Sequence, residues 1–283
     1  MSFGCTVFDS IDVYGIDFTS APSRRKPITC AHTIFDGKTL RFQALKHWHN
    51  FAGFENFLAS GGPWLAGMDF PFGQARRLVE NIGWPRDWAG YVGAVSTLDR
   101  KAFRAELESY KKDREAGDKH HKRGCDVISR SQSPQTLYGT PVGLMFYEGA
   151  PRLLRAGVHL PHHQDGDPQR VVLEAYPGVA VRHLIGDKPY KSDTRKKQTE
   201  DKAAARARLL ELLCGNKGTE VYSFQIFAPD SLADDPGADE LDALICAVQA
   251  AWGWNNRRNG YGAPVAVDRL EGWICDPVMH VPN

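Results

Sequence analysis

The stretch that decides the fold reads Val13-Tyr14-Gly15-Ile16-Asp17-Phe18-Thr19-Ser20-Ala21-Pro22. Branched and small residues alternate along its first half, which is typical of a β-strand, and Ala21-Pro22-Ser23 ends it. The strand leaves a carboxylate, Asp17, at its exit, where backbone pairing stops and side chains can converge on a ligand. Other acidic residues stand at comparable places along the chain, namely Asp69, Glu174 and Asp242.

The residues after this strand predict a hairpin and a helix. Residues 28–35 and 39–44 have strand composition and are joined across Asp36-Gly37, a strong hairpin signal. Aromatic and aliphatic residues then recur at helical spacing over residues 51–58, before a Gly-Gly pair. The chain therefore opens as strand, hairpin and helix.

A second buried strand is expected over residues 64–70, which are apolar and bounded by Pro63 and Pro71. This strand finishes in Asp69. In a strand, hairpin, helix, strand arrangement the first and fourth strands lie side by side. We therefore expect the carboxylates of Asp17 and Asp69 to meet at one edge of the sheet.

The middle of the chain is interpreted as an inserted helical and loop segment, residues 99–168, within a single domain of residues 1–283. Residues 99–115 and 144–154 are expected helices, with a basic loop between them. A His-rich turn follows at residues 159–167, and its spacing favours a solvated turn over a zinc site. The strand signals resume only after this segment.

The rest of the chain predicts a strand, two helices and a return to the sheet. Residues 170–176 are a strand that carries Glu174 near its end and is stopped by Pro177-Gly178. Helices are expected at residues 202–213 and 238–252, and an edge strand at residues 265–274.

The last of these helices permits a geometric argument about two acidic residues. Its apolar stripe consists of Leu241, Leu244, Ile245, Val248 and Trp252. At about 100° per residue, Asp242 lies about 60° from Ile245, on the border of the stripe, and Asp239 lies further into the polar face. A carboxylate at the margin of a buried stripe needs a partner, and a metal ion is one way to provide it.

Composition limits the classes of protein to consider. A chain of 283 residues with 42% hydrophobic residues can bury a sizeable core, and its formal net charge of +1 excludes a general polyanion binder. The charge is uneven, because residues 181–208 hold nine Lys and Arg against four Asp and Glu, whereas residues 228–242 hold six acidic residues and no basic one. A basic face beside an acidic cluster is therefore expected.

The sequence carries no sign of a membrane or secreted protein. The N-terminus lacks the basic head and apolar run of a signal peptide, and no apolar run reaches the roughly 18 residues of a membrane span. The six cysteines are scattered, without a Cys-x-x-Cys pair. We expect a reduced cytoplasmic protein that does not bind membranes.

The four carboxylates suggest a metal site. Mg²⁺ and Mn²⁺ prefer oxygen ligands and are usually held by a few carboxylates together with waters and substrate phosphates. Two such ions about 4 Å apart can support hydrolysis of a phosphodiester. Six basic residues near these positions are candidates to bind the substrate by charge, namely Lys122, Arg123, Lys188, Lys191, Arg195 and Lys196.

Each carboxylate also has a structural interpretation that the sequence leaves open. Asp17 and Asp69 could form turns, since Asp readily hydrogen-bonds the backbone that follows it. Glu174 could make a salt bridge to a basic residue such as Arg182. Asp239 could simply favour a helix N-terminus through the macrodipole.

Taken together, several runs resemble the uncharacterised family catalogued as domain of unknown function 429. These runs are Gly15-Ile16-Asp17-Phe18-Thr19-Ser20-Ala21-Pro22, Gly67-Met68-Asp69-Phe70-Pro71-Phe72-Gly73, Glu174-Ala175-Tyr176-Pro177, Asp239-Glu240-Leu241-Asp242-Ala243-Leu244-Ile245-Cys246-Ala247 and Glu271-Gly272-Trp273-Ile274. The family is regarded as ribonuclease H-like and as predicted nucleases. The resemblance implies that α/β fold, a mixed sheet flanked by helices, and an acidic site at Asp17, Asp69, Glu174 and Asp242, with Asp239 as an accessory.

Three functions remain open from the sequence. The first is a nuclease that hydrolyses phosphodiester bonds of DNA or RNA with one or two Mg²⁺ or Mn²⁺ ions held by the carboxylates. The second is a phosphotransferase or ATPase of the actin and sugar-kinase type, because Gly15-Ile16-Asp17-Phe18-Thr19-Ser20 also resembles their first phosphate loop; the second Gly-rich loop that such proteins need is not visible. The third is a nucleic-acid-binding scaffold without catalysis.

Overall fold

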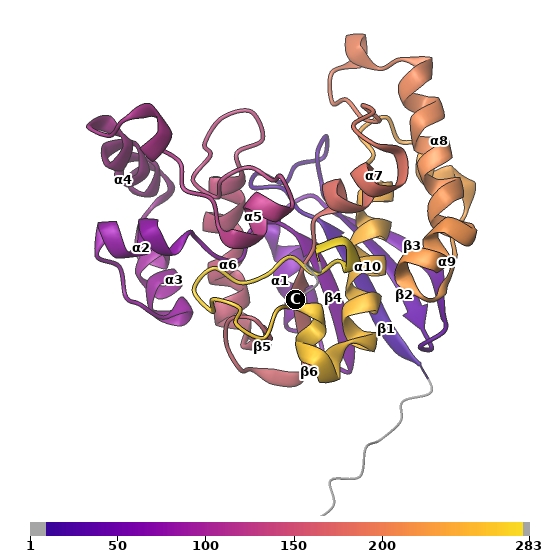
Figure 1. Ribbon diagram of the computed structural model, residues 1–283, viewed down its shortest axis with the longest axis horizontal. Coiled ribbons are helices and arrows are strands. Elements are labelled where there is room, and N and C mark those ends of the chain that lie inside the picture. Colours follow the sequence, from indigo (N-terminus) through magenta and orange to yellow (C-terminus); the bar gives the residue numbers. More distant parts are fainter. Residues whose placement is uncertain (1–9, 280–283) are drawn as a thin grey trace, which may run out of the picture.

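The computed structural model describes residues 10–279, which form one mixed seven-stranded sheet with helices on both faces (Figure 1). The order across the sheet is β5-β6-β4-β1-β2-β3-β7. The strands are β1 (Ile11–Asp17), β2 (Ile28–Phe35), β3 (Thr39–Trp48), β4 (Trp64–Asp69), β5 (Val158–His159), β6 (Asp167–Glu174) and β7 (Gln225–Phe227). The prediction of a mixed α/β sheet flanked by helices is confirmed.

The described residues contain ten α-helices, five of which follow one another between β4 and β5. They are α1 (Phe51–Leu58), α2 (Arg76–Ile82), α3 (Trp88–Ser96), α4 (Arg100–Lys112), α5 (Gly124–Ile128), α6 (Val142–Ala156), α7 (Pro177–Ile185), α8 (Glu200–Cys214), α9 (Asn216–Tyr222) and α10 (Asp239–Asn255). Within residues 10–279, no helix is long and apolar enough to cross a bilayer.

Strand pairing decides which side chains meet at the end of the sheet. Strand β1 pairs with β2 in an antiparallel and with β4 in a parallel sense, and β4 pairs with β6 in parallel. Asp17 is the register partner of Asp69, and Glu174 is the register partner of Met68. The expected side-by-side placement of the first and fourth strands is therefore confirmed.

Two apolar clusters lie on opposite faces of the sheet, because side chains alternate along each strand. Val13 and Leu65 belong to the cluster under α10, whereas Ile16 and Met68 belong to the cluster under α1, α3 and α6. By the same alternation Asp17 and Asp69 project to the α10 face, and Glu174 projects to the other face.

Helix α10 packs unusually close to the two central strands. A Cβ atom added at Gly15 would lie 1.8 Å from the backbone oxygen of Ala243, and one added at Gly67 would lie 2.2 Å from that of Cys246. The two glycines therefore let the helix rest directly on the backbone of β1 and β4. This contact places the first turn of α10 above the strand ends.

One predicted strand is wrong. Residues 265–274 form turns, and Ile274 makes only an isolated bridge to Glu174. The backbone amides of Glu271 and Gly272 both donate to the carbonyl of Asp268, and Gly272 has φ of 75°, so the chain reverses where the strand was expected. Val265 is fully exposed, which removes the burial that its apolar side chain had indicated.

The segment of residues 99–168 contains the two expected helices, α4 and α6, and also contributes the edge strand β5. Its His-rich turn is not solvated as expected, because His162 and His163 are buried. They hydrogen-bond the backbone carbonyls of Gly260 and Arg269, respectively, so they fasten the turn to the C-terminal part of the chain.

We predict that Gly15→Ala destabilises the protein, because the added methyl group overlaps the backbone of α10. Overpacking of this kind costs about 1–3 kcal/mol of unfolding free energy, measured by urea denaturation. The matched control is Gly93→Ala in α3, where a Cβ meets nothing within 4 Å. The control should be as stable as the native chain or more so by up to about 1 kcal/mol; equal stability of both variants would contradict the prediction.

Candidate active site

Three aspartates from three elements meet at one end of the sheet. Asp17 and Asp69 end the neighbouring strands β1 and β4, and Asp242 lies in the first turn of α10. The side chain of Asp242 is fully buried, and Asp17 is 8% exposed. The prediction that Asp242 lies at a buried margin, with Asp239 further out, is confirmed. We call Asp17, Asp69 and Asp242 the aspartate cluster.

A lysine and a tyrosine hold Asp242. The ammonium of Lys191 lies 2.5 Å from Oδ2 of Asp242, and the hydroxyl of Tyr190 donates to Oδ1 at 2.8 Å. The Lys191 side chain is 44% exposed, so its stem lies at the surface while its ammonium turns inward. Burial opposes the charge of this ammonium, but Asp242, Tyr190 and Asp17 raise its pKa well above the ordinary value.

Burial and mutual repulsion make the other two aspartates reluctant to ionise. Burial, which Lys191 opposes and to which the charges of Asp242 and Glu174 add, raises the pKa of Asp69 to about 7. Burial, followed by the charge of Asp239, raises the pKa of Asp17 well above its usual range. Full ionisation of the aspartate cluster would therefore leave more negative charge than the one ammonium of Lys191 neutralises.

The oxygens of Asp17 and Asp69 receive no hydrogen bond or ion pair from any side chain or backbone amide in residues 10–279. Neither aspartate caps a turn, so the turn-forming alternative is not what the structure contains. Carboxylates with little exposure are normally hydrogen-bonded or paired, but the buried Asp17 and the half-buried Asp69 lack such partners among the described residues.

Asp239 lies at the rim and is paired with Lys26. The Lys26 ammonium lies 2.6 Å from Asp239 and 2.9 Å from the exposed Asp193. Burial is the largest cause that raises the pKa of Asp239, and its hydrogen bond from Lys26 works in the opposite direction. Asp239 thus contributes charge to the site from outside the aspartate cluster.

Glu174 belongs to a separate buried network. Arg123 donates to both of its carboxylate oxygens, at 2.8 and 2.6 Å, and also to Asp126. The amide of Phe72 donates to Glu174 at 2.9 Å. The salt bridge that was an alternative for Glu174 is present, but its partner is Arg123 and not Arg182, whose guanidinium donates to the carbonyl of Ser129.

The described residues, 10–279, contain no group of three or more His, Cys, Asp or Glu side chains arranged to hold a metal ion as they stand. Two carboxylates of the site are paired with cations of the chain. Lys191 lies on Asp242, and Arg123 lies on Glu174. The four carboxylates are therefore near one another but separated by cations of the chain itself.

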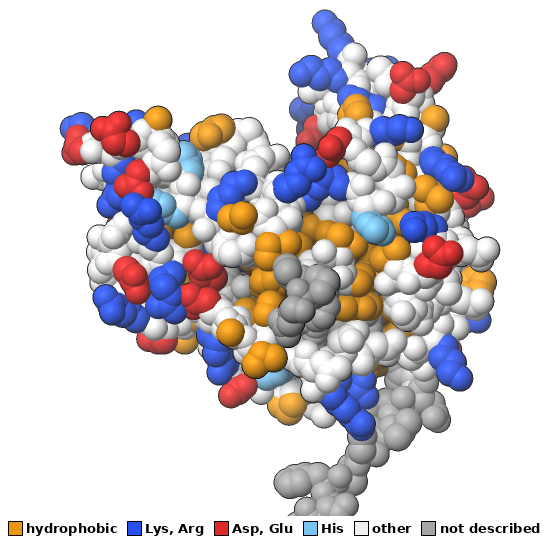
Figure 2. Space-filling view, viewed as in Figure 1, with side chains coloured by type: hydrophobic (Ala, Val, Ile, Leu, Met, Phe, Trp, Pro, Cys, Tyr) orange, Lys and Arg blue, Asp and Glu red, His pale blue; other side chains and the backbone are white. Residues whose placement is uncertain are grey.

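The predicted basic residues differ in their surroundings. Lys122, Lys188, Arg195 and Lys196 are exposed, whereas Arg123 is buried and its guanidinium is taken up by carboxylates and the carbonyl of Glu271. Figure 2 shows a notch in the surface between the part over α4 and α5 and the part over α7 and α8, with Lys and Arg side chains on both sides.

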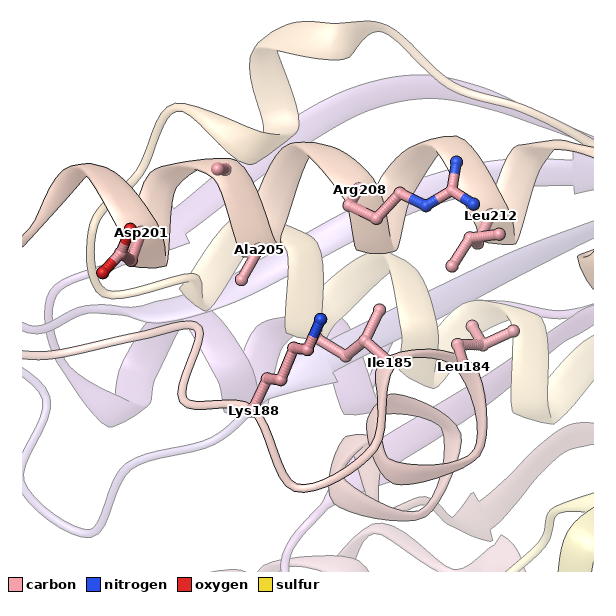
Figure 3. A pocket seen from close by; sticks show the side chains of 8 residues that line it. Leu184, Ile185, Lys188, Asp201, Ala205, Arg208 and Leu212 are labelled. Carbon is pink, nitrogen blue, oxygen red and sulfur yellow. The ribbon is translucent and has the colours of Figure 1, made fainter.

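Two cavities adjoin the aspartate cluster and share Asp69, Tyr176 and Lys191. The first, of about 210 Å³, reaches towards Glu174 and the start of α6, and the second, of about 310 Å³, lies beside α7. A larger cavity of about 640 Å³ lies between the end of α7 and α8, where Leu184, Ile185 and Leu212 approach one another (Figure 3). It has no residue of the aspartate cluster in its wall.

Several residues around the site were not identified from the sequence. Tyr190 hydrogen-bonds Asp242, and its place next to Lys191 is the signal that could have identified it. Lys26 ends a basic run that follows the first strand, which is a signal for a partner of the acidic helix start. Asp126 gave no signal in the sequence, because its role depends on Arg123, whose guanidinium also donates to Glu174 in β6.

We predict that Asp69→Asn removes a pH dependence of stability. The folded chain binds the Asp69 proton more tightly than the unfolded chain, so native stability should fall as pH rises from about 4 to about 7. Discounted for partial solvent exposure, the variant should be more stable than the native chain by about 1–2 kcal/mol at pH 8 and equal to it near pH 4. Urea denaturation across this range tests it, with the exposed Asp165→Asn as control; a parallel pH profile for native chain and Asp69→Asn would refute it.

We predict that Arg123→Met strongly destabilises the chain, since it leaves Glu174 and Asp126 buried without their cation. Breaking a buried pair in this way costs about 3–5 kcal/mol of unfolding free energy. The neighbouring exposed Lys122→Met should change stability by less than about 0.5 kcal/mol. Thermal and urea denaturation compare the two, and similar effects of both substitutions would disprove the structural role of Arg123.

Comparison with known proteins identifies a family but no relative of known function. No curated protein and no solved structure matches the chain. A family model described as a protein of unknown function (DUF429) matches residues 15–265, a range that includes Asp17, Asp69, Glu174 and Asp242. The chain therefore belongs to the DUF429 family.

Proposed function

We propose that the protein is a metal-dependent hydrolase of phosphodiester bonds in DNA or RNA, with the aspartate cluster as its active site. The observation that carries the proposal is the pair Asp17 and Asp69. Asp17 is buried and its neighbour Asp69 is half-buried, and neither carboxylate has a donor in residues 10–279. Both lie beside Asp242, which is paired with the ammonium of Lys191.

The chain topology supports a ribonuclease H-like fold, which the resemblance to the family implies. The chain runs as strand, hairpin, helix and strand, and the first and fourth strands are parallel neighbours. Their carboxylate ends then face the start of a late helix that carries a further acidic residue. This arrangement supports placing the chemistry at the ends of β1 and β4.

The donor set fits a divalent cation in chemistry and charge. Asp17, Asp69 and Asp242 offer only oxygen ligands, which Mg²⁺ and Mn²⁺ prefer. With Lys191 withdrawn, three ionised aspartates offer three negative charges, and a bound divalent ion favours this ionised form over the protonated form that burial favours. When bound, such an ion supplies an activated water and stabilises the leaving oxygen.

The chain's own residues would hold and orient the substrate around that site. Lys191 has to leave Asp242 for the aspartates to bind a cation together, and its exposed stem permits this movement. Lys191 lines the cavity beside α7 together with Arg182 and Lys188, and these three charges would bind phosphate oxygens there. Burial raises the pKa of Glu174, Arg123 opposes this effect, and the ion pair fixes the carboxylate on the opposite face of the sheet.

We predict that the native chain binds Mg²⁺ and Mn²⁺ and that Asp17→Asn and Asp242→Asn each weaken binding by at least about tenfold, because each removes one charged ligand. Lys191→Met should instead tighten binding, since it removes the competing ammonium. Calorimetry measures the affinities, with Asp165→Asn as a matched control, and cleavage of labelled single-stranded, duplex and hybrid substrates is followed in parallel.

The outcomes separate this function from the two others that the sequence leaves open. Native chain that binds neither ion, with or without nucleic acid, would overturn the metal site. Stabilisation against heat by ATP would favour a phosphotransferase. Metal-independent binding of nucleic acid without cleavage would favour a scaffold, in which Lys191 neutralises Asp242 permanently.

A further inference from the structure

The cavity of about 210 Å³ between the ends of β4 and β6 and the segment of residues 131–145 differs in character from the surface around it. Phe70, Val142, Met145 and Tyr176 give it apolar and aromatic walls, and Gln132 and Thr140 stand exposed along its lining. Asp69 and Lys191 lie in the same wall, so the cavity opens directly onto the aspartate cluster. We call it the side cavity.

The size of the side cavity suits one flat ring system. Its volume corresponds to roughly seven water molecules at about 30 Å³ each, and it is smaller than the roughly 300 Å³ at which pockets for drug-sized ligands begin. The cavity therefore has room for the base of a nucleotide, while the sugar and phosphate would lie outside it. The aromatic and aliphatic walls also match the flat faces of a base, which every base presents.

The charges in the side cavity exclude phosphate. Its lining holds Asp69, Asp126 and Glu174 against the cations of Arg123 and Lys191. Oε1 of Glu174 accepts one hydrogen bond, from Arg123 at 2.6 Å, and a carboxylate oxygen can accept two. The cavity therefore presents an acceptor to an amino or imino group, which bases carry and phosphates do not.

The neighbouring cavity beside α7 has the complementary character. Its lining includes Arg182, Lys188 and Lys191 against two carboxylates, Asp69 and Asp187. The ring of Tyr176 lines both cavities, and the guanidinium of Arg182 lies 5.5 Å from the ring centre. An anionic phosphate chain thus suits the cavity beside α7 and a neutral ring suits the side cavity, with the aspartate cluster between them.

We propose that the side cavity binds a single nucleobase, so that the nuclease acts on a nucleotide whose base is unstacked from its neighbours. This inference rests on the proposed function and adds the substrate class. The cavity admits one base and not a base pair, so a substrate strand has to be single or to have that base flipped out. Those residues of the segment that line the side cavity, such as Gln132, Thr140 and Val142, then act in substrate selection rather than in chemistry.

Thr140→Trp tests this inference, because an indole at this exposed position fills the side cavity without disturbing the core. Tyr138→Trp introduces the same ring two residues away, at a side chain that is 69% exposed and outside the cavity wall. Both variants and the native chain are assayed with Mn²⁺ on thymidine 5′-(p-nitrophenyl phosphate), which carries a base, and on bis(p-nitrophenyl) phosphate, which does not.

We expect Thr140→Trp to lower kcat/KM for the base-carrying substrate by at least about tenfold, as loss of one stacked base predicts, and to leave the base-free substrate within about twofold. Tyr138→Trp should change neither. An equal effect of Thr140→Trp on both substrates, or no effect on either, would overturn the base site.

A second measurement is independent of catalysis. The fluorescent nucleotide 2-aminopurine riboside 5′-monophosphate is titrated into each metal-free chain, and stacking in the side cavity should quench it. The native chain and Tyr138→Trp should bind it with quenching, and Thr140→Trp should not. Binding without hydrolysis of either ester would leave the base site standing and the nuclease proposal refuted, whereas absence of binding to the native chain would refute the base site itself.

Discussion

The direct contact between helix α10 and strands β1 and β4 is the constraint on which the candidate site depends. Helices normally rest on a sheet through side chains, but the space above Gly15 and Gly67 is filled by the backbone of α10. The helix axis therefore lies closer to the sheet than side-chain packing allows, and the first turn of α10 reaches the level of the strand ends. Asp242 is consequently buried beside Asp17 and Asp69 and does not stand above them in solvent.

Bringing these carboxylates together is unfavourable because their charges repel one another. The chain neutralises Glu174 more fully than it neutralises Asp17 and Asp69. Burial raises the pKa values of Asp17 and Asp69, and the ammonium of Lys191 offsets only part of this increase. Glu174 is treated differently, because alternation along β6 turns it to the opposite face, where Arg123 neutralises it with two hydrogen bonds. The same end of the sheet thus contains a fixed ion pair, Arg123 with Glu174, and the aspartate cluster, whose negative charge is only partly neutralised. Only the aspartate cluster can bind an additional cation.

The sequence predicted most of the elements because their signals are local. The Asp36-Gly37 hairpin and the apolar run before Asp69 depend on neighbouring residues, and the structure contains both. The stripe of α10 likewise placed Asp242 correctly. Contacts between distant segments were beyond such reasoning, since neither the register of β6 against β4 nor the pairing of Arg123 with Glu174 leaves a local pattern. The false strand at residues 265–274 has the same cause, as its apolar residues are distributed over turns.

The position of Lys191 connects the charge of the cluster with the choice of substrate. Its ammonium lies on Asp242, yet the residue also lines both cavities that meet at Asp69. A cation that binds the aspartates must displace this ammonium, and the nearest acceptors outside the cluster would be those of a substrate in the cavities. Metal and phosphate would then bind cooperatively. The metal takes Asp242 away from the Lys191 ammonium, and the phosphate takes that ammonium away from Asp242, so each ligand frees the group that the other one binds. The exposed stem of Lys191 matters for this reason: a lysine held on all sides would make the cluster a permanent ion pair, whereas this one can exchange partners.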